Sequence, residues 1–171
     1  MRILIATPLY PPDVAPSASY VKELATRLVG GHSVSVIAYG HLPEETKGVT
    51  IIPIAKNLSR PQRLWRFGCA LSKAAKKADV VIIENGSATE APAAILSFII
   101  GLRYLFHITD TEAFTKDRRY SLRGIIRRLA TRRATALIVS PELPSQTALK
   151  HQAINSITLS LIHISEPTRP Y

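Results

Sequence analysis

Two groups of polar residues follow apolar runs and could do chemistry. His107 lies at the end of the run 103–108, and Asp110 and Glu112 come directly after it. An imidazole can hydrogen-bond a ligand or transfer a proton near neutral pH, and a neighbouring carboxylate can orient a hydroxyl group. A structural role is the alternative, because a histidine can close a strand inside the fold and an aspartate can cap a turn.

The second group is Glu84 and Asn85, which follow the apolar run 79–83. Loop residues at the end of a buried strand can reach a ligand. Asn85-Gly86 is also an ordinary turn sequence, so both interpretations stay open at this point.

The elements that must position these residues alternate along the chain. Arg2–Thr7 is apolar between its two end residues and shows no alternation, which is typical of a strand buried on both faces of a parallel sheet. Further strands are predicted over His32–Tyr39, Gly48–Ile54, Asp79–Ile83, Arg103–Ile108 and Ala136–Ser140. Helices are predicted over Ser17–Val29, Arg60–Lys77, Thr89–Ile100, Ser121–Arg133 and Pro144–His151.

Alternating strands and helices favour an α/β fold, a Rossmann-like, doubly wound parallel sheet with right-handed crossovers. In such a sheet, ligands bind at the carboxyl ends of the strands. Both polar groups are therefore expected at that edge.

Composition sets further limits. The chain has 171 residues, of which 46% are hydrophobic, enough for one domain with a core. Its single cysteine, Cys69, cannot form an internal disulfide, and no Cys/His spacing typical of a metal site occurs, so no metal or cofactor is expected. The longest apolar stretch, Ala91–Leu102, is too short to cross a bilayer and favours a buried helix. We expect a cytoplasmic protein, either soluble or peripheral to the membrane.

The net charge of +10 is concentrated in one segment, because Lys116–Arg133 holds eight basic residues and one acid. Apolar residues recur there at helical spacing and are expected to pack on the sheet: Leu122, Ile125, Ile126, Leu129 and Ala130. Four arginines, Arg119, Arg123, Arg127 and Arg128, are candidates to contact anionic lipid or phosphate. The alternatives are a solvated surface helix and, less favoured because aromatic residues are lacking, a nucleic-acid site.

The common phosphate-binding fingerprints are missing. No G-x-G-x-x-G follows the first strand, and no G-x-x-x-x-G-K-[ST] occurs. A nicotinamide or P-loop function therefore loses its main support.

Five motifs in order resemble the N-terminal domain of GT-B glycosyltransferases of family 4. They are Tyr10-Pro11-Pro12, a helical V-x-x-L-A-x-x-L pattern from Val21, Gly31-His32 before a V-x-V strand, 78–81 (ADVV) and 134–140 (ATALIVS). The resemblance covers about residues 1 to 151.

The resemblance implies one Rossmann-like domain of a two-domain, retaining enzyme. Such an enzyme moves a sugar from a nucleotide sugar, its donor substrate, to a cell-envelope glycan or lipid-linked acceptor. The N-terminal domain would carry acceptor-side residues, and the donor would bind a C-terminal domain absent from this sequence. His107 matches the family's position beside the reacting sugar, where it could bond the donor sugar or move the acceptor proton. Asp110 could act with it, and Glu84, Asn85 and Glu112 could bind substrate.

One departure from the family concerns the first loop. The family usually has a Gly-Gly pair there, whose amides approach a phosphate or sugar, and this chain has Ala15-Pro16-Ser17-Ala18 instead. Because proline has no N–H to donate, Ser17 and Ser19 are the candidate contacts in that loop. A non-enzymatic α/β binding module with a basic face for anionic membrane or nucleic acid is the alternative function.

The end of the sequence looks foreign to the fold. Leu159–Arg169 reads LSLIHISEPTR, which matches the translation of a sequencing-library adapter. We expect the domain to occupy 1–158 and to be incomplete, and 159–171 to be a non-native tail. A natural apolar strand is the alternative for this segment.

Overall fold

A parallel sheet forms the centre of the molecule. The computed structural model describes residues 1–40, 43–108, 121–139 and 156–158. Within these ranges the strands are β1 (Arg2–Thr7), β2 (Ser33–Tyr39), β3 (Val49–Ile54), β4 (Val80–Glu84), β5 (Leu105–Ile108), β6 (Ala136–Val139) and β7 (Ser156–Thr158). Their order is β3-β2-β1-β4-β5-β6-β7, and every neighbouring pair is parallel. The predicted α/β, doubly wound class is confirmed.

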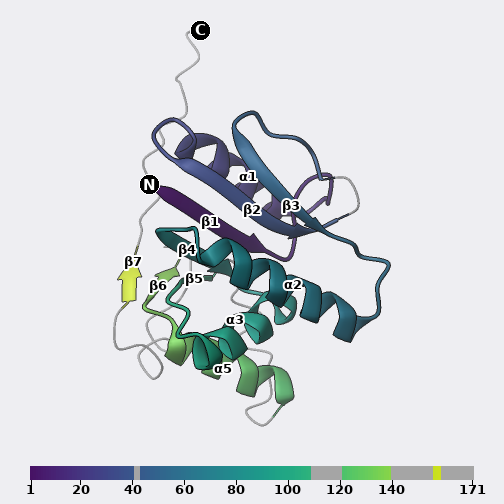
Figure 1. Cartoon of the computed structure of the whole chain (residues 1–171), viewed down its shortest axis with the longest axis vertical. Coiled ribbons are helices and arrows are strands. Elements are labelled where there is room, and N and C mark those ends of the chain that lie inside the picture. Colours follow the sequence, from purple (N-terminus) through teal and green to yellow (C-terminus); the bar gives the residue numbers. More distant parts are fainter. Residues whose placement is uncertain (41–42, 109–120, 140–155, 159–171) are drawn as a thin grey trace, which may run out of the picture.

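Helices cover both faces of this sheet. They are α1 (Pro16–Leu28), α2 (Arg60–Ala75), α3 (Ser87–Ile99) and α5 (Leu122–Arg133), and Figure 1 shows α2, α3 and α5 together, apart from α1. Alternate residues of β1 divide the core between the two layers. Ile3 and Ile5 belong to the cluster that contains Val21 of α1, whereas Leu4 belongs to the cluster that contains Phe67 of α2. The run without alternation in the sequence thus reflects burial on both faces.

The predicted elements agree with the structure to within a few residues. β1 has the expected bounds, and β4 extends one residue further than expected, to Glu84. The predicted helix Pro144–His151 and the tail 159–171 lie outside the described residues. β7 falls in the segment just before that tail.

The apolar helix α3 is less buried than its composition predicts. The side chains that it buries are small or polar for the most part, among them Ala93, Ala94 and Ser97. Its large apolar residues Ile95 and Ile99 are 55% and 71% exposed. α3 packs between α2 and α5. No helix within the described ranges is long and apolar enough to cross a membrane.

The expected apolar stripe of α5 is confirmed only in part: Ala130 is buried, and Ile126 and Leu129 are half-buried. Leu122 and Ile125 are 74% and 52% exposed, although the helical spacing placed them against the sheet. The face that α5 buries consists of Gly124, Arg127, Ala130 and Thr131. The helix packs beside α3, where Arg127 meets Glu90, and two of its larger apolar residues are turned to solvent.

Candidate functional site

The carboxyl ends of β1, β4 and β5 bring three polar side chains together. Thr7 ends β1, Glu84 ends β4, and His107 is the register partner of Glu84 on β5. Because parallel strands share one carboxyl edge, residues 77 and 23 positions apart in the sequence become neighbours there. Thr7, Glu84 and His107 are called the edge triad below.

The carboxylate of Glu84 is the centre of the edge triad. The hydroxyl of Thr7 donates to Oε2 of Glu84 at 2.7 Å, and Oε1 lies 3.3 Å from Nδ1 of His107. Glu84 is 1% exposed and His107 is 4% exposed. A carboxylate held away from water must find partners among protein groups, and Thr7 and His107 supply one for each oxygen.

Tyr20 of α1 covers the imidazole. The two ring centroids lie 5.1 Å apart at an interplanar angle of 31°. Burial and the negative charge of Glu84 both raise the pKa of Tyr20, so its phenol stays neutral. His107 is therefore enclosed between a carboxylate and an aromatic ring.

The loop between β4 and α3 completes this edge. The main-chain N–H of Asn85 donates to the carbonyl oxygen of His107 at 2.9 Å, and Asn85 is buried. A Cβ atom at Gly86 would lie 2.9 Å from Cγ of Pro8, in the loop that follows β1. The two loops touch at this point, which explains a glycine at position 86 better than an ordinary turn does.

Arg127 occupies a place that the sequence did not predict. Its Nε lies 3.2 Å from Oε1 of Glu90, and this pair is buried, with Arg127 at 7% and Glu90 at 0% exposure. The same Glu90 oxygen accepts the main-chain N–H of Gly86 at 3.1 Å. The structure therefore differs from the prediction that Arg127 reaches a membrane or phosphate, because its guanidinium ties α5 to α3.

The remaining predicted residues lie in several places. Ser19 is exposed on α1 and lines a hollow of about 680 Å³ with Pro11, Pro12 and neighbouring residues, none of them in the edge triad. Ser17 is half-buried in the first turn of α1. Arg123 is exposed and Arg128 is half-buried on α5. Asp110, Glu112 and Arg119 lie outside the described residues.

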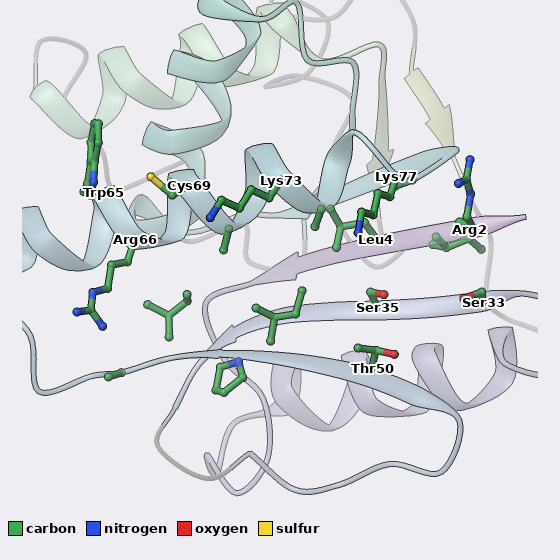
Figure 2. A pocket seen from close by; sticks show the side chains of 18 residues that line it. Arg2, Leu4, Ser33, Ser35, Thr50, Trp65, Arg66, Cys69, Lys73 and Lys77 are labelled. Atoms are coloured by element: carbon green, nitrogen blue, oxygen red, sulfur yellow. The ribbon is translucent and has the colours of Figure 1, made fainter.

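A separate groove of about 860 Å³ runs between α2 and the strands β1 to β3. Figure 2 shows Lys73 and Lys77 on the α2 side and the hydroxyl side chains of Ser33, Ser35 and Thr50 on the strand side. None of the residues predicted from the sequence to bind or react lines this groove. Over the described part of the chain, no three His, Cys, Asp or Glu residues are grouped to hold a metal ion.

Sequence reasoning found Glu84, Asn85 and His107 and missed Thr7 and Tyr20. Tyr20 stands four residues before Leu24 and eight before Leu28, on one row of the helix, and all three pack against the core. That spacing could have placed Tyr20 at the sheet. Thr7 had a weaker signal, the polar end of an apolar strand.

Comparison with known proteins supports the fold only. No protein-family model matches the sequence, and no curated protein matches it. The solved structures of similar shape include three at low sequence identity. The first is HepE from Anabaena in complex with UDP, with 17% identity and a TM-score of 0.65 over 94% of this chain and 44% of that chain.

The other two structures are UDP-GlcNAc 2-epimerases. The protein from Methanocaldococcus jannaschii is 15% identical, with a TM-score of 0.53 over 88% of this chain and 42% of that one. The putative enzyme from Listeria monocytogenes is 14% identical, with a TM-score of 0.52 over 80% of this chain and 39% of that one. This chain therefore spans less than half the length of each structure. A uridine nucleotide is the bound ligand of the first structure and is part of the name of the other two.

Proposed function

We propose that this chain is the N-terminal, acceptor-side part of a retaining GT-B glycosyltransferase of family 4. The enzyme would transfer a sugar, a hexose in our proposal, from a nucleotide sugar to a cell-envelope glycan or lipid-linked acceptor. The observation that carries the proposal is the Glu84–His107 contact at the carboxyl edge of a Rossmann-like sheet. This is the edge at which such sheets bind ligands, and the similar structures include one solved with UDP.

In this proposal His107 acts at the reacting sugar, either as a hydrogen-bond partner of the donor or as a group that moves the acceptor proton. His107 is 4% exposed beneath Tyr20, so direct contact with a sugar requires the Tyr20 ring to turn away. The Tyr20 side chain is half-buried, and a partly exposed ring can move at lower cost than a fully buried one. Asp110 and Glu112 would serve the acceptor from the following loop.

The donor would bind a second domain beyond this sequence. Transfer requires donor and acceptor to be held together, so the chain by itself should be inactive. We place the enzyme in the cytoplasm, peripheral to the inner membrane face, with no cofactor beyond the nucleotide sugar.

The test uses the proposed full-length enzyme, which is assayed for sugar transfer from a panel of nucleotide sugars. We expect His107→Ala to lower turnover about 10²–10⁴-fold while the melting temperature changes little. His32→Ala is the matched control, because His32 directly precedes β2 and so lies at the amino ends of the strands, opposite the edge triad. Full turnover in a folded His107→Ala enzyme would remove His107 from the mechanism, and no transfer with any nucleotide sugar would reject the enzyme proposal.

A membrane-facing role for α5 has a specific observation in its favour. Leu122 and Ile125 are exposed on the same helix as the exposed Arg123. Apolar side chains flanked by arginine are typical of helices that lie in the interface of anionic membranes. A binding module without enzymatic activity could use the same surface, and the assay above separates the two functions.

A further inference from the structure

The two oxygens of the Glu84 carboxylate have different partners. Oε2 accepts from the Thr7 hydroxyl at 2.7 Å, while Oε1 faces Nδ1 of His107 at 3.3 Å. An ionised carboxylate can only accept hydrogen bonds. The imidazole nitrogen that faces it must then carry a proton.

Thr7 has one hydroxyl proton and two acceptors within reach. Its Oγ1 lies 2.7 Å from Glu84 Oε2 and 2.8 Å from the carbonyl oxygen of Leu9, and it accepts the N–H of Leu9 at 3.2 Å. A buried carboxylate is the stronger acceptor because its hydrogen bonds are charge-assisted. The proton of Thr7 is therefore directed to Glu84, and this orients the carboxylate.

The imidazole is held on several sides. The N–H of Asn85 donates to the carbonyl of His107 at 2.9 Å, which fixes the backbone of this residue. Tyr20 lies 5.1 Å away across the ring and limits its rotation. With Nδ1 turned to Glu84, the remaining ring nitrogen, Nε2, is left with its lone pair.

We propose that Thr7 and Glu84 are positioning residues that fix neutral His107 as its Nδ1–H tautomer. The proposal deepens the proposed function, since an Nε2 lone pair can accept the proton of an acceptor hydroxyl whereas an Nε2–H could only donate. Neither Thr7 nor Glu84 needs to touch substrate. The tautomer is a property of the chain itself and can be measured without activity.

The experiment is a long-range ¹H–¹⁵N spectrum of the whole chain labelled with ¹⁵N-histidine, at a pH where imidazole is neutral. The two tautomers shift the two ring nitrogens in opposite directions, so the spectrum reports the tautomer directly. The signals of His107 are those lost in His107→Gln. We expect the wild-type chain to show the Nδ1–H pattern, and an Nε2–H pattern would overturn the proposal.

Two variants and a control test the cause. In Glu84→Gln the new amide can donate to Nδ1, so we expect most His107 rings to change to the Nε2–H form. In Thr7→Val the carboxylate loses the bond that orients it toward the imidazole, so it can turn away from Nδ1, and we expect a partial change in the same direction. Thr89→Val is the control: Thr89 is equally buried, but its hydroxyl donates to main-chain carbonyls of Glu84 and Gly86.

An unchanged tautomer in folded Glu84→Gln, with circular dichroism like that of the wild type, would overturn the proposal. Should that variant fail to fold, Thr7→Val decides the question by the same spectrum. A shift in Thr89→Val as large as that in Thr7→Val would also overturn it, because the effect would then be general to this edge. If the tautomer behaves as expected but His107→Ala leaves transfer intact in the full-length enzyme, the proposed function of His107 fails and the positioning role stands.

Discussion

Arg127 of α5 and Glu90 of α3 form a buried ion pair, in which Nε and Oε1 lie 3.2 Å apart. The same carboxylate oxygen accepts the N–H of Gly86, in the loop that follows β4. One glutamate thus connects α5, the start of α3 and the loop beside His107. Through Glu90, the packing of α5 on α3 is therefore linked to the position of the loop beside His107.

Removing Arg127 should be strongly destabilising. We expect Arg127→Met to lower the free energy of unfolding by about 3–5 kcal/mol, because the Glu90 carboxylate would remain buried without its cation. Urea unfolding followed by circular dichroism measures this. Arg123→Gln, an exposed change on the same helix, should stay within about 0.5 kcal/mol of wild type.

A second variant tests the cause. Arg127→Met combined with Glu90→Gln should recover part of the loss, because the amide oxygen can still accept the N–H of Gly86 and no charge remains buried. An equal or greater loss in the double variant would mean that packing, not charge, sets the cost.

Gly86→Ala should also be destabilising, for a steric reason. The new Cβ would lie 2.9 Å from Cγ of Pro8, whose ring cannot swing away, and we expect a loss of about 1–3 kcal/mol. Gly31→Ala is the control, since nothing lies within 4 Å of a Cβ there. A melting curve in which both variants behave alike would contradict the close approach of the two loops.

Stability should fall at high pH as tyrosines ionise. Burial raises the pKa of Tyr39 from 10.0 to about 12, so the unfolded chain loses this proton first. The contribution of Tyr39 is complete below pH 10 and is lost as the pH rises to about 12, by roughly 2 kcal/mol. Urea unfolding across this range should show a gentler fall for Tyr39→Phe, and identical slopes for the two proteins would contradict the assignment.

The surface of α5 should bind anionic vesicles. We expect co-sedimentation with vesicles that contain phosphatidylserine, little with neutral ones, and a decline as salt screens the charges over about 8 Å at physiological ionic strength. Arg123→Gln should weaken binding roughly fivefold, at about 1 kcal/mol per arginine near the surface. The control is Lys47→Gln, which removes an exposed charge far from α5 in the sequence. An equal effect of both changes would show that binding depends on the net charge of the chain and not on the surface of α5.

The sequence predicts the sheet well because its central strands are buried on two faces. A run such as Arg2–Thr7 has no polar residue inside it, and the prolines that follow mark its end. The edge on which Glu84 and His107 meet also follows from the alternation of strands and helices. What periodicity cannot give is the partner of each side chain.

Arg127 illustrates this limit. Helical spacing assigns an arginine to the solvent side and Leu122 to the sheet, because the spacing reflects the polarity of each residue but not which residue it contacts. The reverse holds here, since a glutamate 37 residues earlier in the chain offers Arg127 a buried carboxylate. The roles of Thr7 and Tyr20 were not predicted for the same reason, because they depend on contacts between strands and between layers of the fold.

Cys69 is the single cysteine of the chain, and it is exposed on α2 in the groove that faces the strands β1 to β3. A thiol-reactive fluorophore would therefore attach at one position without any prior mutagenesis. Trp65 stands one turn earlier on the same helix and is 75% exposed, and Figure 2 shows the two side chains near each other. Trp65 and a fluorophore attached at Cys69 would thus form a fluorescence donor–acceptor pair for reporting on whatever enters that groove.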